Sequence, residues 1–175
     1  HTTDLAVDFG HKVRNLIALD DYRSIFPTVK LAQDSKSAGR WNTNVGGEYY
    51  ACGIGSALAG RGADLLLVDD PHSEQDVING NFSVFEKAYE WFTFGARTRL
   101  MPGGRVAIIQ TRWHLDDLTG RVVRDMGKNE RADQYEVVEF PAILEVVSKK
   151  TKKVTQKPLW PEFFDLEALL RTKAS

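Results

Sequence analysis

The sequence centres on the stretch Ala63-Asp64-Leu65-Leu66-Leu67-Val68-Asp69-Asp70-Pro71. Its four bulky apolar residues, 65–68, follow one another without interruption. This pattern predicts a strand buried on both faces, as in a parallel sheet. Asp69 and Asp70 stand at the carboxyl end of that strand, which is where open α/β sheets bind their ligands. The stretch therefore predicts a ligand site at one edge of a sheet.

A second predicted strand, 105–111, has the same design. Its apolar residues 106–109 give way to Gln110, Thr111 and Arg112. A long helix predicted from Asn81 or Ser83 to Leu100 separates the two strands. Because strand–helix–strand–helix successions form parallel strands joined by crossovers, we predict the α/β class, with a mostly parallel sheet flanked by helices.

Other elements are predicted from hydrophobic periodicity and turn residues. A helix is expected to open at Asp116 and Asp117, whose acids suit the helix dipole. The remaining expected elements are helices over 4–19, 21–26 and 165–171, and strands over 41–43, 48–53 and 135–140.

Composition limits the classes of function. The chain has 175 residues, 42% of them hydrophobic, which is enough for one domain with a core. Its net charge of −1 gives no overall basic field for nucleic acid. Cys52 is the only cysteine, which excludes an intrachain disulfide and a cysteine-based zinc site. The lysine-rich segment 148–157 is predicted to be a solvated hairpin tip rather than a dedicated DNA contact.

The two polar strand ends together favour a nucleoside triphosphatase. Mg²⁺ keeps several waters, so Asp69 can hold it alone as a Walker B acid, while Asp70 orients the attacking water. Gln110 and Thr111 can bind that water or the γ-phosphate. Arg61 or Arg112 can stabilise the developing charge. Two alternatives stay open: the acids can serve only as a helix cap, and Arg61 can form an ordinary surface ion pair.

The phosphate-binding loop of such an enzyme is missing from the sequence. No Gly-x-x-x-x-Gly-Lys-Ser/Thr segment occurs, and Gly60-Arg61-Gly62 precedes a strand instead of following one. This chain alone is therefore expected to bind ATP weakly or not at all. Since it opens on His1 without Met, we expect a fragment of a longer protein.

Other catalytic chemistries have less support. No pair of the four histidines has zinc-like spacing. Asp69, Asp70 and His72 could bind a metal together, but the strand-end interpretation explains the acids better. No Gly-x-Ser-x-Gly nucleophile elbow is present.

Three motifs occur in order: Gly46-Gly47-x-Tyr49-x-Ala51-x-Gly53, then Gly60-Arg61-Gly62 continuing to Asp69-Asp70-Pro71, then Ile109-Gln110-Thr111-Arg112-Trp113-His114-x-Asp116-Asp117-Leu118-x-Gly120-Arg121. Two late segments follow them, Phe140-Pro141-Ala142 and Leu159-Trp160-Pro161-Glu162. The three motifs, at compatible spacing, resemble the large terminase subunit of tailed bacteriophages and prophages, and the two late segments are similar to the end of that family's ATPase domain.

The resemblance implies an additional-strand P-loop ATPase domain, here truncated: residues 1–175 would form a partial domain without the Walker A region and the nuclease domain. By resemblance, Asp69 is the Mg²⁺-associated acid and Asp70 the catalytic carboxylate. Thr111, with Gln110 and Arg112, matches the motif that couples hydrolysis to movement. Arg61 lies near an arginine that acts on a neighbouring subunit's nucleotide.

The implied protein is an ATP- and Mg²⁺-dependent motor that packages double-stranded DNA into procapsids, in the cytoplasm of the bacterial host. Its implied partners are the DNA, the portal protein, the small terminase subunit and further copies in a homo-oligomeric ring, with no membrane. Two alternatives remain: another additional-strand ATPase such as a helicase-like translocase, or a degenerate prophage remnant that acts only as a binding module.

Overall fold

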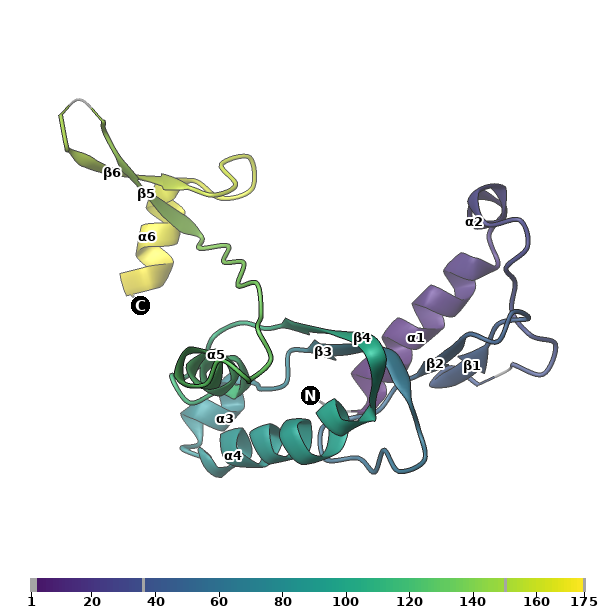
Figure 1. Ribbon diagram of the computed structural model, residues 1–175. Coiled ribbons are helices and arrows are strands. Elements are labelled where there is room, and N and C mark those ends of the chain that lie inside the picture. The colour runs from purple at the N-terminus through teal and green to yellow at the C-terminus, as the bar shows by residue number, and fades with distance from the viewer. Residues whose placement is uncertain (1–2, 36, 150, 175) are drawn as a thin grey trace. The chain divides into compact units, whose positions relative to one another are not determined.

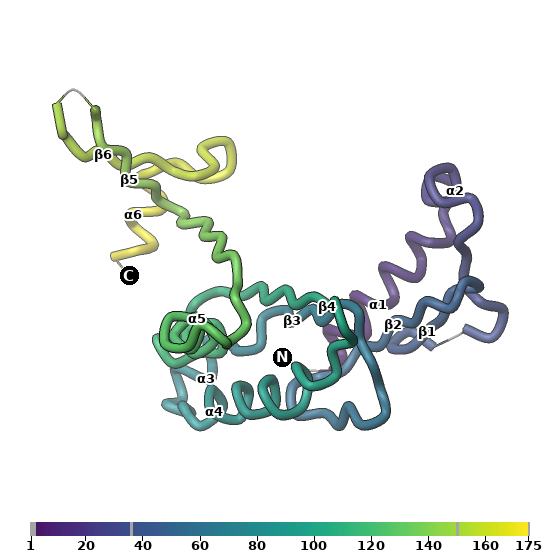
Figure 2. The backbone as a smooth tube through the Cα atoms, viewed as in Figure 1, coloured from purple at the N-terminus to yellow at the C-terminus, as the bar shows by residue number. Residues whose placement is uncertain are grey.

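The structure is a computed structural model that describes residues 3–35, 37–149 and 151–174 (Figures 1 and 2). The chain forms two compact units, His1–Asp133 and Gln134–Ser175. The larger unit contains a helix-and-hairpin region and a parallel strand pair. The smaller unit contains one hairpin and one helix. In the described ranges no helix is both long enough and apolar enough to cross a bilayer.

The first region joins two helices to a short hairpin, as the sequence predicts. Helix α1 spans Thr3–Ile17 and α2 spans Asp20–Ile25, while β1 (Arg40–Asn42) pairs antiparallel with β2 (Glu48–Tyr50). Trp41 lies between helix and hairpin, where its Nε1 donates a hydrogen bond to the Gly10 carbonyl at 3.1 Å and its ring stacks on Tyr49. A Cβ on Gly10 would lie 2.6 Å from the Tyr49 ring, so only glycine permits this approach.

The second region is the predicted strand–helix–strand unit. Strand β3 (Ala63–Asp69) runs parallel to β4 (Leu100–Ile109). Leu65 pairs with Arg105, and the register continues without a break to the pair Asp69 and Ile109. The parallel arrangement of the two strands is therefore confirmed. A sheet order that would define an additional-strand P-loop ATPase stays a prediction, because the sheet has two strands in the part of the chain that is described.

The connection between the strands is helical for most of its length. It comprises α3 (Glu74–Ile78), α4 (Ser83–Glu90), a π-helical turn η1 (Trp91–Ala96) and a 3-10 turn η2 (Arg97–Arg99). The predicted helix to Leu100 thus ends one residue earlier. The Pro102-Gly103-Gly104 segment lies inside β4, where the pairing with β3 shifts its register, and Gly103 has a φ of +83° that suits glycine.

Burial of the strand pair differs from the prediction. Val68 on one face is 4% exposed, and Figure 1 draws α4 beside the β3–β4 pair. On the other face Leu65 is 63% exposed and Leu67 is 57% exposed. The prediction of a strand buried on both faces is therefore wrong for the described chain, because one face of β3 stays largely exposed.

Helix α5 (Leu118–Lys128) follows β4 and begins where predicted, with Asp117 as its N-cap. It packs against α4, as shown by the hydrogen bond from Tyr89 to Asp125 and the ion pair between Arg121 and Glu86 at 2.6 Å. These two contacts hold α5 against α4.

The smaller unit pairs β5 (Ile143–Val147) antiparallel with β6 (Val154–Pro158), followed by α6 (Leu166–Ala174). The lysine-rich segment forms the predicted hairpin tip, except that Lys150 lies outside the described residues. The strand predicted over 135–140 is wrong, since this segment is extended but belongs to none of the three sheets. Its apolar residues stay exposed, with Phe140 at 78%.

Candidate functional site

The candidate site lies at the carboxyl ends of β3 and β4. Since the two strands are parallel and in register at Asp69 and Ile109, the residues that follow them emerge at the same edge. The backbone N–H of Asp70 donates to the Ile109 carbonyl at 2.9 Å, which continues the ladder by one residue. The N–H of Thr111 donates to Asp70 Oδ1 at 3.0 Å. The structure thus brings together Asp69, Asp70, Gln110 and Thr111.

Asp70 has an unusual backbone conformation. Its φ is +40°, in the left-handed region that non-glycine residues seldom adopt. Such residues cost about 1–3 kcal/mol and persist where the surroundings hold them, often at functional sites. Here the hydrogen bond from Thr111 and the buried neighbour Pro71 hold the turn. The side chain of Asp70 is therefore presented in a fixed position between the two strand ends.

Gln110 has an unsatisfied side chain at the same edge. Both its Oε1 and its Nε2 are buried, and neither has a hydrogen-bond partner among the residues described. A buried polar group left without a partner costs about 1–3 kcal/mol. Buried amides are otherwise nearly always paired, so this one fits a ligand that supplies both a donor and an acceptor.

Asp69 is the predicted metal ligand, and its side chain is exposed. No group of three or more histidine, cysteine, aspartate or glutamate side chains that could hold a metal occurs in the described ranges. A single exposed carboxylate of this kind could hold Mg²⁺, which keeps most of its waters and uses one or two carboxylates together with phosphate oxygens.

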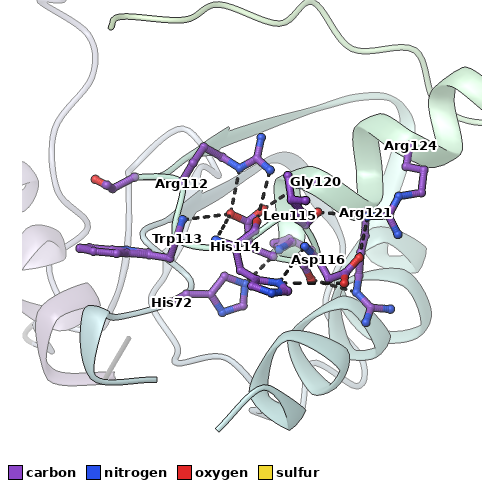
Figure 3. A network of polar contacts seen from close by, with 12 residues as sticks. His72, Arg112, Trp113, His114, Leu115, Asp116, Gly120, Arg121 and Arg124 are labelled. Atoms are coloured by element: carbon purple, nitrogen blue, oxygen red, sulfur yellow. Dashed lines mark hydrogen bonds and ion pairs between the residues drawn. The ribbon is translucent and has the colours of Figure 1, made fainter. Parts of the chain in front are cut away.

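A buried carboxylate, that of Asp117, organises the loop after β4. Asp117 is fully buried. Its Oδ2 accepts hydrogen bonds from Arg112 Nε at 2.8 Å and from the N–H groups of Trp113 and His114 at 3.2 and 3.4 Å. Its Oδ1 caps α5 by accepting from the Gly120 N–H at 2.8 Å. Figure 3 shows Arg112, Trp113, His114 and Gly120 close together in this network of polar contacts.

His72 ties the loop after β3 to the same helix. It is 3% exposed, and its Nε2 accepts a hydrogen bond from the Leu118 N–H at 3.0 Å. Burial lowers the pKa of His72, while the nearby charges of Asp117 and Asp76 oppose that shift. The neutral imidazole with an unprotonated Nε2 is the form that can accept this bond.

The outer part of this network is more exposed. Asp116 pairs with Arg124 at 2.6 Å, and this hydrogen bond holds the pKa of the Asp116 carboxyl below its usual value. The Asp116 N–H donates to His114 Nδ1 at 3.0 Å, and Arg121 Nε donates to the Asp116 carbonyl. Figure 3 shows Arg121 and Arg124 side by side on α5, next to Asp116. These contacts stabilise the start of α5 but do not extend to the strand ends.

The two predicted cationic residues do not join the strand-end cluster. Arg112 follows Thr111 directly, yet its guanidinium is bound to Asp117. Arg61 precedes β3, and the seven-residue strand puts about 20 Å between its first residue, Ala63, and Asp69 at roughly 3.3 Å per residue. There it pairs with Glu48 at 3.0 Å and lies over the Tyr50 ring at 3.7 Å. Within one chain the structure therefore separates Arg61 from the site.

Sequence reasoning missed the roles of His72 and Asp117 at this site. Asp117 was expected only to favour the helix dipole, although the Asp-x-x-Gly pattern of 117–120 is compatible with the cap that is found. For His72 no sequence signal exists, because its partner Leu118 is 46 residues away.

Comparisons with protein-family models, with curated proteins and with solved structures give no match to this chain.

Proposed function

We propose that this chain is part of the ATPase motor domain of a phage-type terminase large subunit, which packages double-stranded DNA into procapsids. One observation carries the proposal: Asp70 Oδ1 accepts a hydrogen bond from the Thr111 N–H between the ends of two adjacent parallel strands. An acid at the end of one strand and a polar residue at the end of the next are the arrangement that the resemblance requires.

The residues at the strand ends have distinct roles in this proposal. Asp69 holds Mg²⁺ through its exposed carboxylate. Asp70 orients the attacking water and accepts its proton. The unpartnered amide of Gln110 and the hydroxyl of Thr111 bind the γ-phosphate or that water. When bound, Mg²⁺ neutralises charge on the phosphate oxygens.

The arginines act differently from each other. Arg112 supports the loop through Asp117, so its contribution to nucleotide binding is indirect. Arg61 acts in trans, on the nucleotide of a neighbouring copy in a homo-oligomeric ring. Its place at the opposite end of β3 from Asp69 supports this proposal, because it cannot reach its own site.

The proposal requires a phosphate-binding loop from outside the printed sequence, since none occurs within it. It also places the protein in the cytoplasm of the bacterial host, with double-stranded DNA, the portal protein and the small terminase subunit as partners. The bare edges of the β3–β4 pair are compatible with further strands beside it.

The test is Asp70→Asn in the full-length protein that the resemblance implies. Asparagine tolerates positive φ, so the turn should be kept. We expect DNA-stimulated ATP hydrolysis to fall by about 10²–10⁴-fold, the usual contribution of a general base, while nucleotide binding changes little. Asp64→Asn, the same change at an exposed position earlier in β3, is the matched control and should keep full activity. An Asp70→Asn protein that loses binding as strongly as hydrolysis contradicts the assigned role.

A further inference from the structure

We propose that His72 and Asp117 are positioning residues that fix Asp70 and Gln110 relative to each other by binding the amino end of α5. This inference rests on the proposed function, because it concerns the geometry of the same site. Neither residue touches the reacting groups; each acts through the loop that carries one of them.

The loop after β3 connects Asp70 to His72. Only Pro71 separates Asp70 from His72, and Pro71 and His72 are both buried. Because proline fixes its own φ, little freedom remains between the carboxylate and the imidazole. The hydrogen bond from the Leu118 N–H to His72 Nε2 therefore fixes the position of this loop relative to α5.

The loop after β4 connects Gln110 to Asp117. Gln110 is separated from Arg112 by Thr111 alone, and Arg112 is bound to the buried carboxylate of Asp117. The same carboxylate accepts from the next two backbone N–H groups. Charge-assisted hydrogen bonds of this kind are about twice as strong as neutral ones. The path from Gln110 to Asp117 is thus short and firmly held.

The two loops are bound to consecutive residues of the chain. Asp117 is the N-cap of α5 and Leu118 is its first residue. Phe85, 1% exposed, contacts both loops. The His72 ring meets its ring edge-on, with centroids 4.7 Å apart, and the His114 ring stacks on it, with centroids 5.3 Å apart. The amino end of α5 and Phe85 therefore hold both loops in fixed positions.

Fixed loop positions matter because catalysis depends on sub-ångström placement of the reacting groups. A displacement of about 1 Å at reacting groups can cost about 10²-fold in rate. Loss of the bond to Leu118 frees the loop that carries Asp70 while leaving Asp69 within β3. We therefore expect a fall in kcat, with little change in the KM for ATP.

The experiment compares variants of His72 in the full-length protein. His72→Phe keeps a ring against Phe85 but removes the acceptor for the Leu118 N–H. His72→Gln can place an oxygen near the position of Nε2, whereas His72→Asn is too short to do so. His11→Phe, at an exposed position of α1, is the matched control. ATP hydrolysis is normalised to nucleotide-binding sites titrated in each preparation, so that loss of folded protein does not imitate loss of kcat.

We expect kcat to fall by about 10–100-fold in His72→Phe and His72→Asn, with KM within about twofold of the wild-type value. His72→Gln should restore most of the rate, and His11→Phe should retain it. If His72→Phe does not fold, the difference in kcat between His72→Gln and His72→Asn still tests the positioning role. In ¹⁵N spectra of the unaltered protein, His72 should show the tautomer protonated at Nδ1.

Two results overturn the inference and are distinguishable. If wild-type protein hydrolyses ATP and His72→Asn keeps the wild-type kcat, the positioning role is wrong while the proposed function stands. If Mg²⁺–ATP neither binds nor is hydrolysed by the wild-type protein, the proposed function is wrong and the inference falls with it.

Discussion

The two faces of the β3–β4 pair differ sharply, although the same strands supply both. On one face Val68 is 4% exposed, and beyond the strand end the loop after β3 is bound to α5 through His72. On the other face Leu65, Leu67 and Ile109 are each more than half exposed. The difference shows that the apolar run 65–68 has two roles: one half forms a core within this chain, and the other half has no cover within the described residues.

The largest effect is expected from the buried ring of Phe85, which contacts the rings of His72 and His114. Phe85→Ala should lower the free energy of unfolding by about 3–5 kcal/mol, because a fully buried aromatic ring leaves a cavity. Leu67→Ala on the bare face should cost less than about 1 kcal/mol, since its side chain is already in water. Urea denaturation of both variants measures the contrast. Equal losses in the two variants would show that the bare face is covered in solution.

Asp117→Asn should have the next largest effect. The amide keeps the shape of the carboxylate but loses the charge that pairs with Arg112, and its NH₂ faces donors. We expect a loss of about 2–3 kcal/mol of unfolding free energy, the usual cost of leaving buried donors unsatisfied. Asp116→Asn is the matched control: its pair with Arg124 is exposed and screened by solvent, so its loss should be the smaller of the two. A larger loss for Asp116→Asn than for Asp117→Asn would refute this ranking.

The smallest expected effect is a pH dependence that arises from His72. Because burial lowers the pKa of His72 below the ordinary histidine value of 6.5, the unfolded chain binds this proton at higher pH than the folded chain. The free energy of unfolding should therefore begin to fall as the pH drops below about 6.5, and should continue to fall until the lowered pKa is reached. Denaturant titrations at several pH values measure this slope. In His72→Gln the corresponding slope should be absent, and its persistence would assign it to another group.

Local features of the fold were predictable because they depend on neighbouring residues. The α1 helix, the turn at Asn44–Gly47 and the helix start at Asp117 follow from periodicity, turn residues and caps. The parallel pair also follows, because a strand–helix–strand order has few solutions. For the same reason the sequence was sufficient to place Asp69, Asp70, Gln110 and Thr111 at one edge.

The remaining features depend on what packs against a segment, and a single sequence does not contain that information. Val137 and Val138 have a strong strand propensity, yet they lie in no sheet. Likewise, Leu65 and Val68 have similar hydrophobicity but opposite exposure. The bonds of His72 and Asp117 join residues brought together by tertiary structure, so they appear only once the strands and α5 are in place.

The π-helical turn η1, Trp91–Ala96, is a place where the chain can lose one residue without disturbing the sheet. Such a turn corresponds to one residue inserted into an α-helix. A deletion at Phe94, which is 75% exposed, would convert the turn to ordinary α-helix and leave β4 free to keep its register. A deletion within β3 would instead move each following side chain to the opposite face of the sheet. Differences of one residue between related chains should therefore collect in η1 and be rare in the strands.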